Sequence, residues 1–296
     1  MTSVHKRKDI QAMIAETRNT SSEDEKYLKE RFQQRNIAKT IYNSKQPYFI
    51  TKELRSELNL LQHILDNPST YPWVGHIAHL VPRDHDFVSF GDSSLYAAGG
   101  YSLDLKFWWY LEWPQEIQSK TLKYFKSSIK DHTTGELISI NLLEYATAII
   151  NYAAASVALQ THPNLLSEDN PYPVLLNFAD NEATNSWIRK TPYSTPKHRA
   201  LSRLLCDLRM NNPIGLNSSY ISTFDNFIAD YLSRLHHVDF GTPCDTSFLL
   251  QKYPTLISCQ RFQLSQELYS SLIKGLLQGL KPGLQMIKTL GQIQAD

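Results

Sequence analysis

The stretch Val174-Leu175-Leu176-Asn177-Phe178-Ala179-Asp180-Asn181 is an apolar run of strand length that ends on an acid. A continuous apolar run predicts a strand buried on both faces, as strands of parallel sheets are. Asp180 falls at the carboxyl end of this strand, where open α/β sheets bind their ligands. The residues that follow, 181–190, are predicted to form a helix. This stretch therefore predicts an α/β fold with an acidic group at one sheet edge.

Three further strands are predicted before this run. Residues 88–92 alternate between larger and small side chains, with the period of two that is typical of a strand. Residues 97–102 contain Gly99-Gly100, which suits a bulge or a close backbone approach in a second strand. Residues 105–113 are rich in aromatic side chains and favour a third strand, with the tryptophans in the core. The short connections favour an antiparallel meander.

Helices are predicted between and after these strands, at 138–160, 197–210 and 225–234, with a short strand at 220–222. The order of elements predicts a mixed five-stranded sheet with helices packed on it.

The chain ends look different from the centre. A capping box predicts a helix over 22–42, and an apolar stripe at Leu54, Leu58, Leu61 and Leu65 predicts another. Residues 236–262 look irregular, 263–280 look helical, and the tail has little to anchor it. We therefore expect a helical N-terminal extension over 1–75, an α/β domain over 76–236, and a helical C-terminal extension over 237–296.

Composition limits the classes of protein that fit. The 296 residues are 42% hydrophobic with a net charge of +1, so the chain should fold but carries no bulk basic signal for nucleic acid. The three cysteines form no CxxC pair, which argues against a zinc site or a disulfide framework. The charged N-terminus does not resemble a signal peptide, and residues 142–159 fall short of a membrane span. An intracellular location, cytoplasmic or nuclear, with no membrane partner is expected.

Four acids stand out because each lies beside apolar residues, where a lone carboxylate is costly to bury. They are Asp92, Glu144, Asp180 and Asp230. We expect Asp92 and Asp180 at strand ends, and Glu144 and Asp230 on helices over the same edge. Clusters of this kind hold two metal ions in nucleases. The four acids are therefore predicted as both metal ligands and catalytic residues.

The motifs around these acids resemble the ribonuclease H domain of gypsy-type and DIRS-type retrotransposon reverse transcriptases. The most specific is Asn226-x-x-Ala229-Asp230-x-Leu232-Ser233-Arg234, which is similar to the family's terminal motif. Weaker matches are Gly91-Asp92-Ser93-Ser94, Ile140-Asn141-x-Leu143-Glu144, and Asp180-Asn181-Glu182-Ala183 followed by Trp187 and Lys190. Residues 45–85 resemble the join to the polymerase, and 248–262 resemble the segment after the domain.

This resemblance implies a ribonuclease H-like fold and hydrolysis of the RNA strand of RNA/DNA hybrids by two Mg²⁺ ions, with Mn²⁺ as a second option. It implies that RNA is chosen through its 2′-hydroxyls, with Glu144 near one of them. The implied substrate contacts are Ser93, Asn181, Arg189 and Lys190, together with Arg199. A reverse transcriptase or recombinase chain is an implied partner.

The chain departs from the family pattern in ways that keep alternatives open. Insertions are expected near 114–135 and 161–173, and the stretch 219–223 lacks the His that family members often carry before the last acid. The alternative is a weak or inactive domesticated module that binds nucleic acid or a partner. A third option is an accessory domain that docks on a polymerase or recombinase chain through the apolar faces at 54–65 and 264–276.

Overall fold

The computed structural model describes residues 84–126, 137–166, 172–190, 195–212, 214–235, 246–279 and 287–294, with isolated helical residues between 55 and 66. The chain divides into two compact units, Met1–Leu58 and Asn59–Asp296. The helix predicted over 22–42 and most of the leucine stripe lie outside the described residues. The description below concerns the second unit, and the predicted domain boundaries stay predictions.

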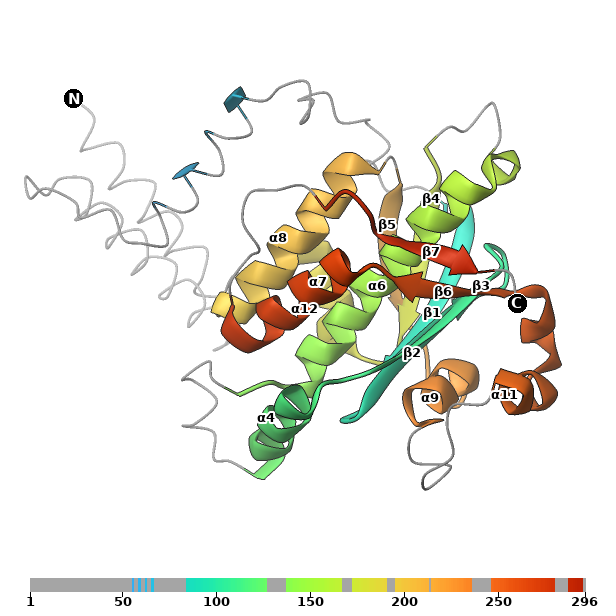
Figure 1. Ribbon diagram of the computed structural model, residues 1–296, viewed down its shortest axis with the longest axis horizontal. Helices are drawn as coiled ribbons and strands as arrows, with labels where there is room; N and C mark the ends of the chain where they lie inside the picture. The colour runs from blue at the N-terminus through green and yellow to red at the C-terminus, as the bar shows by residue number, and fades with distance from the viewer. Residues whose placement is uncertain are drawn as a thin grey trace, which may run out of the picture. The chain divides into compact units, whose positions relative to one another are not determined.

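The second unit is built on a seven-stranded mixed sheet in the order β5-β4-β1-β2-β3-β6-β7 (Figure 1). β1, β2 and β3 form an antiparallel meander, and β4 and β5 continue the sheet in parallel beside β1. β6 runs parallel to β3, and β7 runs antiparallel to β6. The strand bounds are β1 Phe87–Ser93, β2 Ala97–Ser102, β3 Phe107–Glu112, β4 Val174–Ala179, β5 Gly215–Tyr220, β6 Gln260–Leu264 and β7 Gly291–Gln294.

The α/β class, the meander and the buried parallel strand β4 are thus confirmed, whereas the five-stranded sheet is wrong. β6 and β7 come from stretches expected to be irregular or poorly anchored. Both are short, four or five residues, and β7 reads Gly-Gln-Ile-Gln, so neither carries a strong strand pattern. β5 starts at Gly215, earlier than the strand expected at 220–222. The prediction missed this start because the small polar residues of β5 show no clear alternation of apolar and polar side chains.

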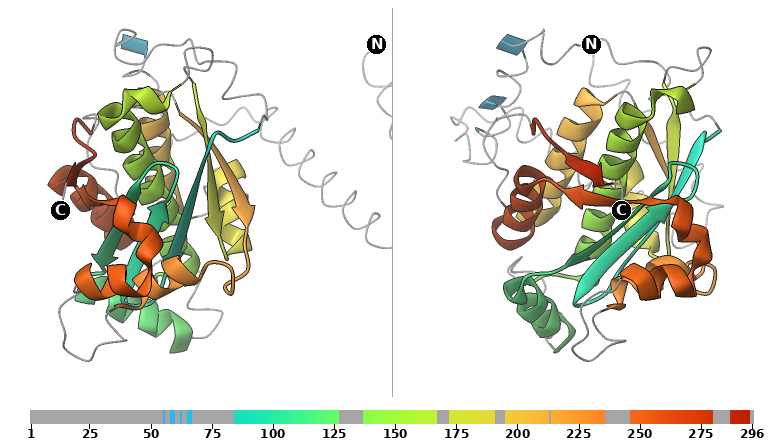
Figure 2. Two further views of the ribbon diagram at one scale, coloured as in Figure 1. Left: turned by 90° about the vertical axis from the view of Figure 1, so that its right-hand side faces the viewer. Right: turned by 45° about the vertical axis from the view of Figure 1, so that its right-hand side comes forward.

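Seven α-helices and two short 3₁₀ helices accompany the sheet within the described residues. Their bounds are α4 Gln115–Lys126, α6 Ile140–Thr161, η3 Pro163–Leu165, α7 Glu182–Lys190, α8 Pro196–Asn211, α9 Phe227–Ser233, α11 Thr246–Lys252, η4 Pro254–Ser258 and α12 Gln266–Gln278. α4 lies within residues 114–135, and the expectation that this stretch is an insertion stays a prediction. Figures 1 and 2 show α6 running along the sheet with α8 and α12 beside it.

The two faces of the sheet bury separate apolar clusters. Phe107 and Trp109 of β3 face the cluster formed with α6, α8 and α12, and Trp108 between them faces the cluster formed with α9 and α11. This alternation follows from the period of two along a strand. Trp108, Trp109 and Trp113 are at most 1% exposed, which confirms the core position expected for them.

α6 is the central helix of the larger cluster. Ser139 caps it by accepting a hydrogen bond from the Leu142 amide, and residues 142–159 are all buried. Among the described helices, α6 alone is long and apolar enough to cross a membrane, but its whole apolar window is buried inside the fold. Asn151 within it accepts a hydrogen bond from the Trp109 indole at 2.7 Å and donates to Asn177 at 2.8 Å. These bonds fix α6 against the sheet.

The C-terminal residues are part of this fold. α12 packs against α8, and its stripe of Leu268, Leu272 and Leu276 is fully buried. The helix predicted over 263–280 is confirmed, but its apolar face is covered by the chain's own core and is not a free docking surface.

Candidate metal centre

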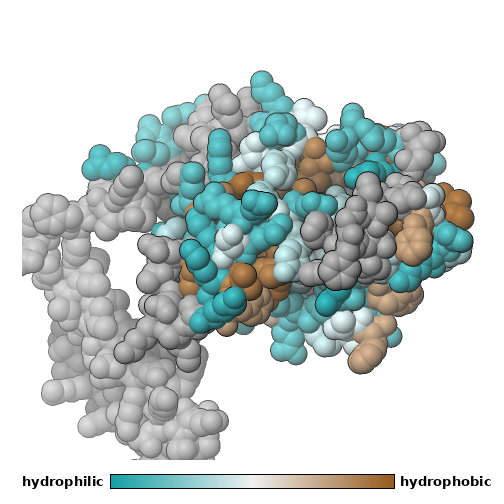
Figure 3. Space-filling model, turned by 60° about the horizontal axis from the view of Figure 1, so that its bottom comes forward, coloured by the Kyte–Doolittle hydropathy of each residue, from teal (hydrophilic) through white to brown (hydrophobic). Residues whose placement is uncertain are grey.

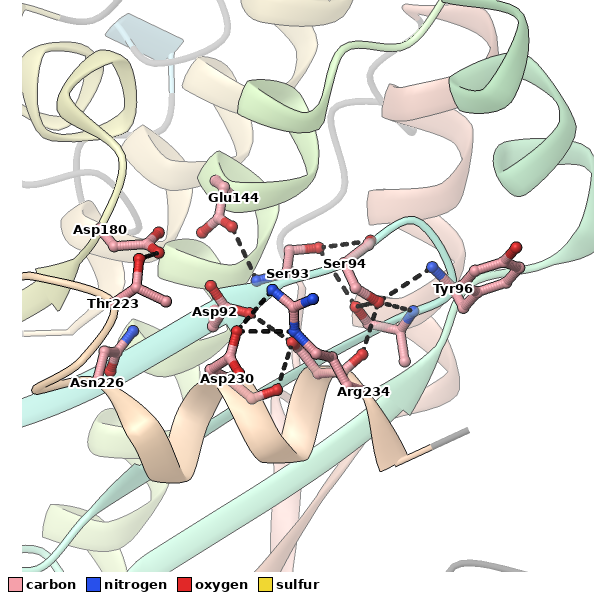
Figure 4. Close-up of polar contacts among 12 residues, drawn as sticks. Asp92, Ser93, Ser94, Tyr96, Glu144, Asp180, Thr223, Asn226, Asp230 and Arg234 are labelled. Carbon is pink, nitrogen blue, oxygen red and sulfur yellow. Dashed lines mark hydrogen bonds and ion pairs between the residues drawn. The ribbon is translucent and has the colours of Figure 1, made fainter. Parts of the chain in front are cut away.

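Four separate elements bring the predicted acids to one end of the sheet. Asp92 lies in β1, Glu144 near the start of α6, Asp180 directly after β4, and Asp230 in α9. Carboxylate oxygens of Asp92, Glu144 and Asp180 all lie within 4.8 Å of one another. Figure 4 shows Asp92 in the middle, with Glu144 and Asp180 on one side and Asp230 on the other. This spacing suits a divalent cation held by shared oxygen ligands.

The strand pairing explains why two of the acids meet. β1 and β4 are neighbours and parallel, with Phe90 opposite Phe178. Asp92 and Asp180 each follow two residues later, so their carboxyl groups emerge at the same edge. This is the arrangement expected for ligand-binding groups of an open sheet.

α9 is held close to the sheet by two contacts. The Asn226 side-chain amide donates to the Gly91 carbonyl at 3.0 Å, and Asn226 is fully buried. A Cβ added to Gly99 would lie 2.3 Å from the Cβ of Leu232, so only glycine permits this approach of helix and strand. Of the two options predicted for the glycine pair, a bulge or a close backbone approach, Gly99 shows the close approach. This approach places Asp230 next to Asp92.

Asp92 is 4% exposed and accepts a hydrogen bond from the Ser233 hydroxyl on Oδ2. Burial raises the pKa of Asp92 to about 6, the Ser233 bond opposes this rise, and the charges of Asp180 and Asp230 add to it. The carboxylate form of Asp92 is therefore less favourable than in water, and a cation in the cluster would stabilise it.

Glu144 is 3% exposed and buried against the other acids. Its Oε1 accepts a hydrogen bond from the Ser93 amide at 2.9 Å, whereas Oε2 is buried and has no hydrogen-bond partner among the described residues. Burial and the neighbouring Asp92 charge raise the pKa of Glu144 well above its usual value. An orphan carboxylate oxygen on a residue grouped with two further carboxylates is a donor set that could hold a cation.

Asp180 and Asp230 have partners of their own. The Thr223 hydroxyl donates to Asp180 at 2.8 Å, so the loop between β5 and α9 rests against this acid. Arg234 contacts Oδ1 of Asp230 through both Nε and Nη2 at 2.7 Å. This ion pair holds Asp230 on the exposed side of the cluster and outside the group of three.

The four residues predicted to contact substrate have different surroundings. Ser93 is buried, and its hydroxyl accepts a hydrogen bond from the Trp113 indole at 3.1 Å. Asn181 caps α7 through the Thr184 amide and donates to Asn141 at 2.8 Å. Arg189 and Lys190 are exposed at the far end of α7, about 10 Å along the helix from its start. Contacts of these residues with substrate stay predictions, as does the role of Arg199 in α8.

Four residues that support the site were not predicted as site residues: Ser233, Arg234, Asn226 and Thr223. The first three belong to the motif around Asp230, but no role was assigned to them. Ser233 and Arg234 follow Asp230 by three and four residues, so helical spacing alone places them on its face. Thr223 lies in a loop, and no pattern in the sequence pointed to its contact with Asp180.

Comparison with protein-family models, with curated proteins and with solved structures returns no match for this chain. The class of site is therefore defined by its own geometry. It is a partly buried carboxylate cluster at a sheet edge, able to hold a metal ion.

Proposed function

We propose that the chain is a metal-dependent endonuclease of the ribonuclease H type, which hydrolyses the RNA strand of RNA/DNA hybrids. The observation that carries this proposal is the convergence of Asp92, Glu144 and Asp180, with oxygens within 4.8 Å, beside Asp230 on α9. Their order along the chain, Asp-Glu-Asp-Asp, is the order that the retrotransposon resemblance implies. The meander of β1 to β3 with β4 parallel beside β1 is compatible with the implied fold.

The donor set favours Mg²⁺, with Mn²⁺ as a second option. Both prefer carboxylate and water oxygens, and the described part of the site offers acids without a sulfur or imidazole ligand. Asp92, Glu144 and Asp180 would hold the metal, with Asp230 beside them. Bound divalent ions would polarise the scissile phosphate, lower the pKa of the attacking water and stabilise the leaving 3′ oxygen.

The protein's own groups orient the carboxylates. Ser233 fixes one oxygen of Asp92, the Ser93 amide fixes one oxygen of Glu144, and Thr223 fixes one oxygen of Asp180. Each contact leaves the second oxygen of the same carboxyl group available to a cation. RNA would be selected over DNA through the 2′-hydroxyls displayed in the minor groove of the hybrid.

Hydrolysis of a labelled hybrid tests the proposal. With Mg²⁺, we expect cuts in the RNA strand of a hybrid, and much slower cleavage of the corresponding DNA duplex. Asp92→Asn and Glu144→Gln should each lower the rate by about two orders of magnitude or more, because loss of even an outer-shell partner of a metal ligand costs about 10- to 100-fold. Glu116→Gln, which changes an exposed acid on α4, should cut like the wild type. Absence of RNA cleavage at high protein concentration would refute the proposal.

A non-cutting relative of these nucleases is the second candidate, favoured by two observations. Arg234 forms an ion pair with Asp230, and the stretch 219–223, whose Thr223 donates to Asp180, lacks the His that the family often carries before the last acid. In that case the chain would bind hybrids, or a reverse transcriptase or recombinase chain, without hydrolysis. Binding of a hybrid that stays intact in Mg²⁺ and in Mn²⁺ would favour this candidate. The intracellular setting belongs to both proposals.

A further inference from the structure

A cluster of aromatic rings and one cation lies beside the acidic site, where α9 meets α11. We call it the aromatic ledge and define it by Phe227, Tyr231, Lys252 and Tyr253. The ring of Tyr253 lies 5.9 Å from that of Phe227 and 5.2 Å from that of Tyr231, measured between centroids. The Lys252 ammonium lies 3.8 Å from the Tyr231 centroid and 5.5 Å from that of Tyr253.

The outer part of the ledge faces solvent. Phe227 is 54% exposed, and Phe224 in the preceding loop is 92% exposed. Lys252 is exposed and Tyr253 is partly exposed, whereas Tyr231 is buried beneath them. Figure 3, which brings the bottom of Figure 1 forward, shows hydrophobic side chains at the right-hand and lower right-hand margin, the side on which α9 and α11 lie in Figure 1. Single exposed apolar residues are common, whereas exposed apolar groups that lie together, here around a cation, are typical of a binding surface.

The ledge is continuous with the acidic site. Phe227 and Asp230 lie three residues apart on α9, so they are neighbours on its surface. Burial raises the pKa of the Tyr253 hydroxyl, and the nearby charge of Asp230 adds to this rise. A chain that passes over Asp230 would therefore meet the ledge next.

We propose that the aromatic ledge binds an unpaired segment of a nucleic acid strand that continues past the acidic site. Base faces would stack on Phe227 and Tyr253, and phosphates would approach Lys252. This inference rests on the proposed function, because it takes the acids as the place where a phosphodiester lies. A protein occupant is disfavoured by the exposed ammonium at the centre of the ledge, which offers charge complementarity to phosphates. Stacking is tolerant of sequence, so the ledge would accept any base.

Binding of overhang-bearing hybrids tests this site. The wild-type protein is titrated in EDTA against fluorescent RNA/DNA hybrids that are blunt or carry a single-stranded extension at either end of either strand. We expect one of the extended hybrids to bind about tenfold more tightly than the blunt one, the loss of one stacked base being worth roughly that factor. Phe227→Ala should abolish this advantage, and Phe227→Tyr should keep it.

Further variants separate stacking from loss of structure. Phe227→Leu keeps an apolar side chain against Tyr253 but lacks a π-face, so it should behave like Phe227→Ala. Phe125→Ala, which removes a 59% exposed ring on α4, should leave the advantage unchanged. Lys252→Gln should lower the slope of log K against log salt for the extended hybrid by about 0.7.

The outcomes distinguish the ledge from the nuclease proposal. Equal binding of blunt and extended hybrids, or an advantage that persists in Phe227→Ala, overturns the ledge and points to a different occupant, even if the wild type cleaves RNA. An advantage that depends on Phe227, in a protein that cuts no substrate, supports the ledge while refuting the nuclease activity.

Discussion

At the scale of single residues, burying the acids in their charged form costs folding free energy, and this cost depends on pH. The pKa of Asp92 is raised from 3.8 to about 6, and that of Glu144 is raised as well. The folded state therefore binds more protons than the unfolded state between these values, so stability of the metal-free protein falls as pH rises from about 4 to above 6. A variant without the Asp92 charge should therefore lose less stability as the pH rises.

The expected result is that Asp92→Asn, in EDTA, is more stable than the wild type at pH 8 by up to about 3 kcal/mol, and that the difference vanishes near pH 4. Urea unfolding at the two pH values measures it. Glu116→Gln serves as the control and should show no such dependence on pH. A destabilised Asp92→Asn at pH 8 would contradict the electrostatic account of the cluster.

A second prediction concerns Ser233, whose hydroxyl donates a hydrogen bond to Asp92. Its hydrogen bond lowers the pKa of Asp92, so Ser233→Ala should raise that pKa. The pH at which Mn²⁺ binding reaches half its maximum should then move upward, whereas Ser233→Thr should restore it. Calorimetric titration with Mn²⁺ across pH measures this shift. Weaker binding with an unchanged pH midpoint would indicate a structural role only.

Much of the site was predictable at this scale. The four acids were found because carboxylates stand out among apolar neighbours, and the string that ends at Arg234 fixed the last of them. The partners of the acids were harder to find. The Ser93 amide and the Thr223 hydroxyl reach the acids only because the folded backbone brings them there. A serine or threonine in a loop shows no sequence pattern that predicts such a contact.

At the scale of elements, the contact between α9 and β2 decides where Asp230 lies. A methyl group on Gly99 would meet the Leu232 Cβ at 2.3 Å and its backbone carbonyl carbon at 3.1 Å, so the helix would have to move. Gly99→Ala should cost about 1–3 kcal/mol of stability, as overpacked sites do, and should weaken metal binding. Chemical unfolding and Mn²⁺ titration check both effects.

The matched control is Gly275→Ala in α12. Its added methyl would lie 3.5 Å from Leu201, an ordinary contact, and alanine favours a helix interior over glycine by up to about 1 kcal/mol. This variant should therefore be neutral or slightly more stable. Similar losses in both variants would show that the close approach at Gly99 has no special importance.

The elements were predicted to different degrees for physical reasons. β1 to β4 and α6 carry strong apolar patterns and were found within a few residues. β5 to β7 are short or rich in small polar side chains, and they become strands through pairing with a neighbour already in place. Such strands depend on tertiary contacts that local sequence does not encode.

At the scale of the whole molecule, the C-terminal residues complete the core of the sheet domain. Leu272 of α12 is fully buried in the cluster that also contains α6 and α8. Leu272→Ala should cost about 2–5 kcal/mol and should lower the stability of the entire sheet domain in one transition. Ile257→Ala, at a 67% exposed position, should change stability by less than about 0.5 kcal/mol.

Unfolding in denaturant, monitored by tryptophan fluorescence, tests whether the sheet domain unfolds in one transition. Trp108 and Trp109 are suitable probes because they lie in β3 beside β6. An early separate transition in Leu272→Ala, with the fluorescence of β3 unaffected, would show that the C-terminal residues form an independent extension.

The whole fold also explains why acids that are distant in the sequence lie together. Asp92 and Asp230 are far apart in the chain, and only the sheet order and the packing of α9 on β1 and β2 bring them side by side. The central claim is that this assembled cluster uses divalent ions to cut RNA. It is tested most directly by the single-turnover rate of RNA-strand cleavage in a hybrid as Mg²⁺ is varied, for the wild type and Asp92→Asn. The account predicts a rate that rises with Mg²⁺ in the wild type and falls at least about a hundredfold in the variant. Equal rates in the two proteins, or no cleavage at any Mg²⁺ concentration, would contradict it.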